Sequence, residues 1–203
     1  MSTNPLHSDI WELYQTLRKE KRKNWKRTLP FNELLFDRWE KAQFLGAGKN
    51  ASIYDNSYVF GNVIIGENTW IGPYTILDGS GGKIKIGKYC SISSGVHIYS
   101  HNSVNWSLTG GKVSNEKKGI SIGDNCYIGP YSVISMGSKI GKNCVVGAFS
   151  LIKSNISPNS IVFGNPAKVV GKINVKGKMV KFTYFDKKRS DNLKNISFQN
   201  YNK

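Results

Sequence analysis

Residues 120–152 read ISIGDNCYIGPYSVISMGSKIGKNCVVGAFSLI, and an aliphatic residue returns at every sixth position of this stretch. The same spacing runs from Ile53 to Leu77 and, in a shifted register, from Ile86 to Ile98. The repeat positions are Ile53, Val59, Ile65, Ile71, Leu77, Ile86, Ile92, Ile98, Ile122, Ile128, Ile134, Ile140, Val146 and Ile152. Every one of them is Ile, Leu or Val, so the middle of the chain is a true repeat.

A six-residue period does not match the 3.6-residue turn of an α-helix, but it fits a short strand followed by a sharp corner. Two further columns follow the same period. Glycine often comes directly after the aliphatic residue, as at Gly66 and Gly147, and asparagine comes three residues after it, as at Asn125. Both residue types tolerate the left-handed backbone of a tight corner. Three such sides predict a triangular coil of about 18 residues, with stacked coils joined as parallel strands about 4.8 Å apart.

The three cysteines, Cys90, Cys126 and Cys144, all stand two residues before a repeat aliphatic position. Small residues such as serine and threonine fill this column elsewhere, so it points toward the interior. The cysteines are therefore predicted to be buried, reduced core residues. Three cysteines in 203 residues also exclude a disulfide scaffold. A metal cluster is not expected, because it needs ligands at matched spacing and more histidines.

The repeat resembles the hexapeptide-repeat acyltransferases over roughly residues 51–172. The maltose, galactoside and surface-polysaccharide sugar O-acetyltransferases are the most similar, through the stretches SSGVHIYSH, ISIGDNCYIGPYSVI and VFGNPAKVVGKI. This resemblance implies an all-β fold, a left-handed parallel β-helix. It also implies acetyl-CoA as acyl donor, no metal, and a homotrimer with active sites at the subunit boundaries.

The chain carries a net charge of +16, which invites a nucleic-acid interpretation. The excess is unevenly distributed, because residues 171–203 hold nine basic and two acidic side chains, whereas residues 46–170 hold eleven and five. The repeat core is therefore only modestly basic, and no nucleic-acid partner is expected. A basic tail at residues 173–203 is predicted, with a short strand at 178–184 and poor order beyond it.

The first 48 residues form a predicted N-terminal helical arm, followed by a β-helix domain at residues 49–172. Ile10, Leu13, Tyr14 and Leu17 fall on one helical stripe, which Ser8 is expected to cap. A second helix is expected at residues 32–44, with Leu35, Phe36 and Trp39 facing inward. The basic run between them, residues 18–27, fits either a solvated helix face or a contact with an anionic membrane or glycan.

Chemistry is expected where the repeat breaks. The spacing between Leu77 and Ile86 is nine residues, and a polar loop at residues 99–121 separates Ile98 from Ile122. Two of the three histidines, His97 and His101, flank this loop. Acyl transfer to a hydroxyl needs a base, and an imidazole with the ordinary pKa near 6.5 suits that task.

The resembling enzymes carry their catalytic histidine just after a GVHIY-like stretch, which maps onto His101, with His97 as a second candidate. Asp78, in the family's ILD stretch, is the expected acidic partner of His101, and Glu116 is a weaker alternative. A turn-forming role for Asp78 before Gly79 fits the sequence nearly as well. Tyr99, Trp106 and His97 are candidates for binding the sugar, although packing of the loop explains the two aromatic residues equally well.

The family's donor-binding positions map onto Gly129, Ala148, Lys153 and Lys168. The family's Thr-Lys pair appears here as Lys153-Ser154, and the asparagine that the family often carries before the ILD stretch is missing from Gly72-Pro73-Tyr74. Lysines pair with the phosphates of acetyl-CoA, and backbone amides beside Gly129 or Ala148 are candidates for holding the oxyanion.

The expected function is transfer of an acetyl group from acetyl-CoA to a sugar hydroxyl, as in a surface-polysaccharide precursor. N-acetylation of an amino sugar or small amine is the main alternative, and a non-catalytic β-helix scaffold is an alternative of another class. A zinc lyase of the γ-carbonic-anhydrase type, which shares the fold, is disfavoured because it needs three histidines. No secretory signal and no long apolar run are seen, so a cytoplasmic protein is expected.

Overall fold

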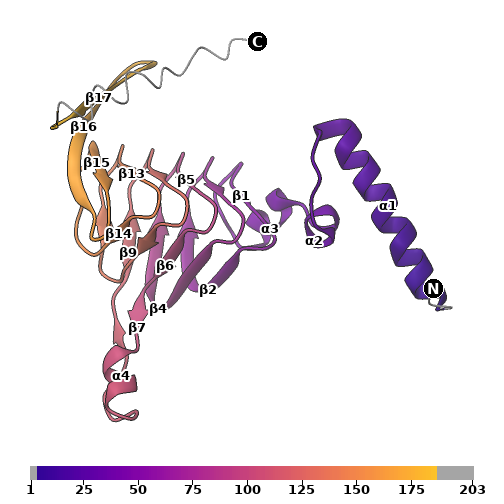
Figure 1. Cartoon of the computed structure of the whole chain (residues 1–203), viewed down its shortest axis with the longest axis horizontal. Helices are drawn as coiled ribbons and strands as arrows, with labels where there is room; N and C mark the ends of the chain where they lie inside the picture. Colours follow the sequence, from indigo (N-terminus) through magenta and orange to yellow (C-terminus); the bar gives the residue numbers. More distant parts are fainter. Residues whose placement is uncertain (1–3, 187–203) are drawn as a thin grey trace.

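The computed structural model describes residues 4–186, which wind into a triangular coil of stacked parallel strands with helices at one end (Figure 1). One face of the coil is a single sheet whose strands are parallel as far as β15. Its strands are, in order, β1 (Ser52–Ile53), β3 (Trp70–Ile71), β5 (Ser91–Ile92), β10 (Tyr127–Ile128), β13 (Val145–Val146), β15 (Ser160–Phe163), β16 (Lys168–Lys176) and β17 (Met179–Tyr184).

The other two faces share a second sheet, because β4 turns the corner between them. The first residues of β4 pair with β6 and the last with β9, and β2 runs beside β4 on both faces. This sheet has the order β12 (Lys139–Ile140), β9 (Ile120–Ile122), β4 (Ile76–Ile86), β6 (His97–Tyr99), β11 (Val133–Ile134) and β14 (Leu151–Ile152), with β2 (Tyr58–Ile65) on β4. The predicted β-helix is confirmed.

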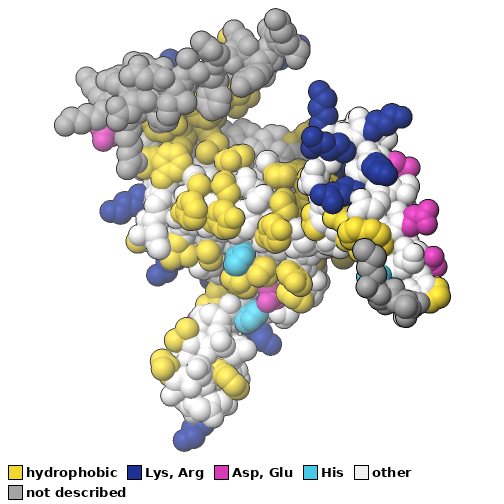
Figure 2. All heavy atoms as spheres, turned by 45° about the vertical axis from the view of Figure 1, so that its right-hand side comes forward, with side chains coloured by type: hydrophobic (Ala, Val, Ile, Leu, Met, Phe, Trp, Pro, Cys, Tyr) yellow, Lys and Arg dark blue, Asp and Glu magenta, His cyan; other side chains and the backbone are white. Residues whose placement is uncertain are grey.

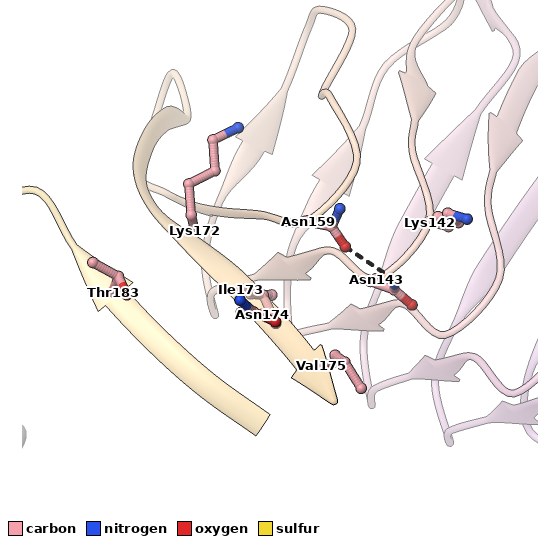
Figure 3. Close-up of a pocket in the computed structure, with 8 residues that line it drawn as sticks. All are labelled: Lys142, Asn143, Asn159, Lys172, Ile173, Asn174, Val175 and Thr183. Carbon is pink, nitrogen blue, oxygen red and sulfur yellow. Dashed lines mark hydrogen bonds between the residues drawn. The ribbon is translucent and has the colours of Figure 1, made fainter. Parts of the chain in front are cut away.

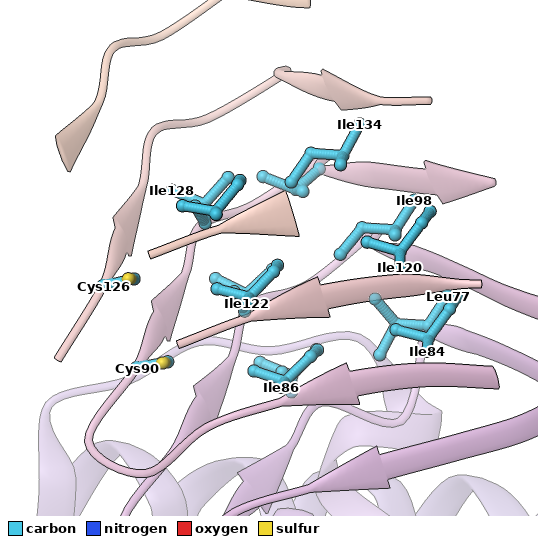
Figure 4. Packing of buried hydrophobic residues seen from close by; sticks show 14 of the residues in the cluster. Leu77, Ile84, Ile86, Cys90, Ile98, Ile120, Ile122, Cys126, Ile128 and Ile134 are labelled. Atoms are coloured by element: carbon cyan, nitrogen blue, oxygen red, sulfur yellow. The ribbon is translucent and has the colours of Figure 1, made fainter. Parts of the chain in front are cut away.

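The repeat aliphatic residues form the core that the sequence predicted. They align in register from coil to coil, as in the pairs Ile53 with Ile71 and Ile128 with Val146. Thirteen of the 14 are buried, and Val59 is partly buried against them. Figure 4 shows these side chains stacked inside the coil together with the cysteines. Burying one such side chain stabilises the fold by about 1.5–3 kcal/mol.

The cysteines lie in the interior column where the sequence predicted them. Each thiol donates to a backbone carbonyl of the next coil, Cys90 to Gly123 and Cys126 to Gly141. All three are free and buried. They are therefore packing residues that also satisfy carbonyls at a corner.

One corner of the coil is built from asparagines in the left-handed backbone region. Asn68, Asn125 and Asn143 have φ angles of 56°, 58° and 55°, as their spacing predicted. Their amides form a ladder, in which Asn125 donates to Asn143 at 3.1 Å and Asn143 donates to Asn159 at 3.0 Å. Aromatic residues at other corners, such as Tyr131 with a φ of 57°, adopt the same conformation and were not predicted.

The nine-residue spacing after Leu77, predicted as a break in the repeat, lies within the continuous strand β4. The glycines of residues 78–82 allow extended chains to approach closely, and β2 follows β4 through a register shift between Gly61 and Val63. The excursion at residues 99–121 contains β7 (His101–Asn102), α4 (Val104–Leu108) and β8 (Glu116–Lys117), and it projects away from the coil (Figure 1).

Three helices precede the coil: α1 (Pro5–Trp25), α2 (Phe31–Leu35) and α3 (Arg38–Phe44). The cap of α1 is Asn4 and not Ser8, because the helix begins earlier than the apolar stripe indicates. The single helix expected at residues 32–44 is broken, since Asp37 caps α3 by accepting a hydrogen bond from the Trp39 amide at 2.8 Å.

The residues that these short helices bury also differ from the prediction. Leu35, Phe36 and Trp39 are exposed, whereas Leu34 and Ala42 are buried. Lys41 of α3 donates to the Asp55 and Ser57 carbonyls at 2.6 and 2.8 Å, so α3 closes the open end of the coil. Such a polar cap is what a solenoid end requires.

The opposite end is covered by an antiparallel hairpin of β16 and β17. The strand predicted at residues 178–184 is confirmed as β17. β16 includes residue 173, where the tail was expected to begin, and it pairs with β15 so that the sheet continues into the predicted tail. The rest of the predicted tail, residues 187–203, lies outside the described residues.

Replacing Ile128 with Ala should lower the free energy of unfolding by about 2–5 kcal/mol, because a fully buried methyl-rich side chain leaves a cavity between two coils. Urea denaturation at fixed protein concentration measures the change. Ile64→Ala is the matched control, since Ile64 is exposed, and it should cost less than about 0.5 kcal/mol. Equal losses in the two variants would contradict the assignment of the core.

Candidate active site

Asp78 and His101 come together where the projecting excursion leaves the coil. Asp78 lies on β4 and His101 on β7, and Asp78 Oδ2 is 3.9 Å from His101 Nδ1. Both side chains are mostly buried but reach the surface. His101 Nδ1 itself is buried without a hydrogen-bond partner among the described residues. Asp78 is thus placed to stabilise a proton on this nitrogen.

The backbone that positions His101 is tied to the β4 segment after Asp78. Ser100 is fully buried, and its hydroxyl donates to the Asp78 carbonyl at 2.7 Å and accepts from the Gly81 amide at 3.0 Å. Gly81 must be glycine, because a Cβ there would lie 2.4 Å from His101 Cβ. The extra residues between Leu77 and Ile86 therefore hold the backbone of His101 in place.

Asp78 is also a turn-type acceptor, as the alternative interpretation expected. Its Oδ1 accepts hydrogen bonds from the Ser80 amide and hydroxyl. The two roles are compatible, because Oδ1 faces Ser80 while Oδ2 faces His101. The contact with Ser80 holds the carboxylate toward the histidine.

His97 and Tyr99 lie beside this pair on β6. Tyr99 Oη is 3.2 Å from His97 Nδ1, and Tyr99 is in register with Asp78. Burial, and then the neighbouring Asp78 carboxylate, raises the pKa of Tyr99 above its usual value. The phenol therefore stays protonated at neutral pH, and the tyrosine engages His97 rather than His101. Figure 2 shows two histidines flanking an acidic side chain on a partly hydrophobic face.

Two exposed aromatic residues adjoin the pair and were missed in the sequence. Phe60 on β2 is directly in register with Asp78, and Tyr58 stacks on Phe60 with ring centroids 6.1 Å apart. They occupy the outward positions beside the repeat residue Val59, and the alternation around Val59 was the only signal for them. Their flat faces are available to a ring-shaped ligand.

The other residues of the excursion do not join His101. Glu116, the alternative acid, accepts hydrogen bonds from the Asn102 and Asn105 amides at 2.9 and 2.8 Å, so it braces the excursion. Trp106 is exposed on α4, beyond the β7–β8 ladder, and a Cβ at Gly111 would lie against its ring. Trp106 is therefore available to a partner but is not part of the Asp78–His101 pair.

The expected donor residues lie on the later coils. Gly129 is buried where two coils touch, and a Cβ there would be 2.6 Å from the Ala148 amide nitrogen. The Gly129 amide donates to the Val146 carbonyl at 2.8 Å, so it is already used and does not serve as an oxyanion donor. Ala148 is exposed next to it.

Lys153 and Lys168 are exposed and belong to neighbouring segments. The Ala167 amide donates to the Leu151 carbonyl at 2.9 Å, which brings the turn before Lys168 beside β14, just before Lys153. Lys153 extends the row of outward residues that includes Asp78 and Tyr99. Because β6, β11 and β14 are consecutive strands, Lys153 lies roughly 10 Å from Tyr99 along this face.

A groove lies elsewhere, under the β16–β17 hairpin at the asparagine corner (Figure 3). It has a volume of about 620 Å³ and is lined by Lys142, Asn143, Asn159, Lys172, Ile173, Asn174, Val175 and Thr183. None of the predicted site residues is among them. Within residues 4–186, no group of three or more His, Cys, Asp or Glu side chains is arranged to hold a metal ion.

Comparisons with known proteins agree with the fold. The family model "Bacterial transferase hexapeptide (six repeats)" matches residues 119–154. The structure is similar to a maltose O-acetyltransferase from Clostridium difficile 630, with a TM-score of 0.61 and 27% sequence identity over 85% of this chain and 90% of that one.

Two further structures share the fold. A hexapeptide-repeat-containing acetyltransferase from Vibrio cholerae has a TM-score of 0.60 and 23% identity, covering 84% of this chain and 94% of that one. AntD, an N-acyltransferase from Bacillus cereus in complex with dTDP and 3-hydroxybutyryl-CoA, has a TM-score of 0.53 and 20% identity, covering 78% and 94%.

The coil and its repeat define a hexapeptide-repeat β-helix protein. Together with the matched family model and the similarity to the maltose O-acetyltransferase, they make this chain similar to the hexapeptide-repeat acyltransferases. The resemblance predicted from the sequence is confirmed. No helix in the described part of the chain is long and apolar enough to cross a bilayer.

Gly81→Ala should lower acyl-transfer turnover at least about tenfold while the β-helix stays folded, because the added methyl group displaces the backbone that carries His101. Turnover is measured by thiol release, and folding by circular dichroism. Gly110→Ala is the control, since Gly110 lies in the same excursion, has a positive φ, and would bring an added methyl group into open space. If both variants keep full activity, the close packing at Gly81 does not position His101 for catalysis.

Proposed function

We propose that the protein transfers an acetyl group from acetyl-CoA to a hydroxyl of a sugar, such as a surface-polysaccharide precursor, with His101 as general base. The observation that carries this proposal is the pair of His101 and Asp78 at the mouth of the long excursion from the repeat. An acid beside one ring nitrogen orients the imidazole and leaves the other nitrogen for the substrate.

In the proposed reaction the unprotonated ring nitrogen of His101 takes the proton of the acceptor hydroxyl. The oxygen attacks the thioester carbonyl carbon, a carbon–oxygen bond forms, and the carbon–sulfur bond then breaks. The imidazolium returns its proton to the departing CoA sulfur. Asp78 stabilises the positive charge that His101 carries in between.

A direct transfer is favoured over an acyl-enzyme. The thiols of Cys90, Cys126 and Cys144 are buried inside the coil, and Ser100 beside His101 is fully buried and hydrogen-bonded at both ends. None of these four nucleophiles is accessible to a thioester, which supports the acceptor hydroxyl as the attacking group.

The donor is expected along the later coils. Lys153 and Lys168 offer exposed ammonium groups to its phosphates, close to the face that holds His101. Acetyl-CoA is supported by relatives of this fold. One structure of the Vibrio cholerae acetyltransferase is a complex with acetyl-CoA, and AntD is bound to 3-hydroxybutyryl-CoA.

The proposal extends to the finer architecture implied by the family. It includes a left-handed winding of the coil, a homotrimer, and a division into an arm (1–48), a β-helix domain (49–172) and a basic tail (173–203) whose first residues belong to β16. Exposed aromatic residues at the corners, including Tyr131 and Phe149 with ring centroids 5.3 Å apart, support a subunit contact on the outer faces.

His101→Ala should lower turnover by on the order of 10²–10⁴, because the general base is lost. Release of free CoA is measured against a panel of sugars, nucleotide sugars, lipid-linked glycans and amines, which also separates O- from N-acetylation. His97→Ala is the matched control and should retain most of the activity. A wild-type rate in His101→Ala, or an equal loss in His97→Ala, would contradict the assignment of His101.

Phe60→Ala should raise the KM for the acceptor several-fold and leave the KM for acetyl-CoA unchanged, because the ring lies beside Asp78 and offers a stacking face of about 1 kcal/mol. Steady-state kinetics with each substrate varied in turn measures the two constants. Phe44→Ala removes another exposed ring, at the end of α3 and away from the site, and is the control. An unchanged acceptor KM in Phe60→Ala would remove Phe60 from the acceptor site.

A further inference from the structure

α1 stands beside the β-helix rather than within its core. None of its residues is buried, and its ring contact with the rest of the chain is the edge of Tyr14 against Phe31 at 5.5 Å. Figure 1 shows the helix set apart from the coil. A helix of 21 residues, about 30 Å long, thus exposes nearly its whole surface.

The exposed surface of α1 has a continuous apolar stripe. Leu6, Ile10, Leu13 and Leu17 recur at helical spacing, and the first three are exposed. Trp25 ends the helix with 64% of its surface exposed, whereas Trp11 is 56% exposed on another side of the helix, in line with Arg18 and Arg22. So large an apolar area on an unpacked helix marks a contact surface.

The second half of α1 adds a dense positive charge. Residues 18–27 hold seven Lys or Arg and one Glu, a net of +6. Figure 2 shows these side chains as a blue cluster on the helix. None of the seven is ion-paired within the part of the chain that the structure describes. Favourable interaction with the helix dipole needs only the basic residues of the last turn, so it does not explain the whole run.

We propose that α1 is an anchor that lies flat on an anionic membrane surface. The apolar stripe enters the boundary between headgroups and acyl chains, with Trp25 at that level, and the basic run at 18–27 contacts anionic headgroups. An amphipathic basic helix with leucines on its apolar face is the usual form of such an anchor. This inference is independent of the proposed reaction.

Charge favours a membrane over a second copy of the chain. Pairing the stripes of two parallel α1 helices would bring two runs of +6 together, and like charges at that distance repel. An anionic bilayer satisfies the apolar stripe and the basic run at the same time.

The test is co-sedimentation of the full-length protein with vesicles of phosphatidylcholine containing about 30% phosphatidylglycerol, and with phosphatidylcholine alone. Binding is expected only to the anionic vesicles, and it should weaken as salt is raised. Arg22→Glu/Lys23→Glu should lower the partition coefficient by at least roughly 30-fold, from about 1 kcal/mol per basic residue. Leu6→Ser/Leu13→Ser should lower it without changing the charge.

Lys178→Glu/Lys181→Glu is the matched control, because it makes the same charge change on the exposed hairpin. It should keep most of the binding, and thiol release with a water-soluble acceptor should be unchanged in every variant. Equal binding to both vesicle types, or an equal loss in the hairpin variant, would overturn the proposal. Oligomer dissociation in the α1 variants without a change in vesicle binding would assign the stripe to a second copy instead.

Discussion

Stacked coils stay in register only if each coil places an aliphatic side chain at the same points of the interior, and the rest of this structure depends on that constraint. Ile71 lies on Ile53 and Ile92 on Ile71, although the second step spans more residues than the first. The backbone ladders follow from this stacking, because strands of only two residues have little cooperativity of their own. Hydrophobic burial of the column is the dominant stabilising term.

The same constraint explains where the candidate site lies. A coil that must keep its column in register can absorb extra residues only by pushing them outward. The residues added after Leu77 become the extended middle of β4, and those added after Ile98 become the projecting excursion. Asp78 lies at the start of the first insertion and His101 at the start of the second. Adjacent coils therefore bring together two residues that are 23 positions apart in the sequence.

The fold could be predicted from the sequence because it follows from the repeat, whose period indicated the column of Ile128 and its partners. The long break in the period pointed to His97 and His101, and the resemblance to the acyltransferase family selected His101 and its proposed partner Asp78. Phe60 could not be found in this way, since its position opposite Asp78 depends on a strand register that no local pattern encodes. The break in the second helix was missed because the capping of α3 by Asp37 competes with a continuous apolar pattern. The occupied amide of Gly129 follows from coil-to-coil hydrogen bonding, which becomes visible only once the coils are stacked.

The central claim is that the acetyl group passes directly from the thioester to a hydroxyl beside His101. A single-turnover reaction with acetyl-CoA labelled at the carbonyl carbon, followed by mass spectrometry of both protein and acceptor, tests this most directly. We expect the label to appear on the acceptor as an ester at the rate at which CoA is released, with none on the protein, and His101→Ala to slow both events together. Label accumulating on the protein before it reaches the acceptor would contradict direct transfer.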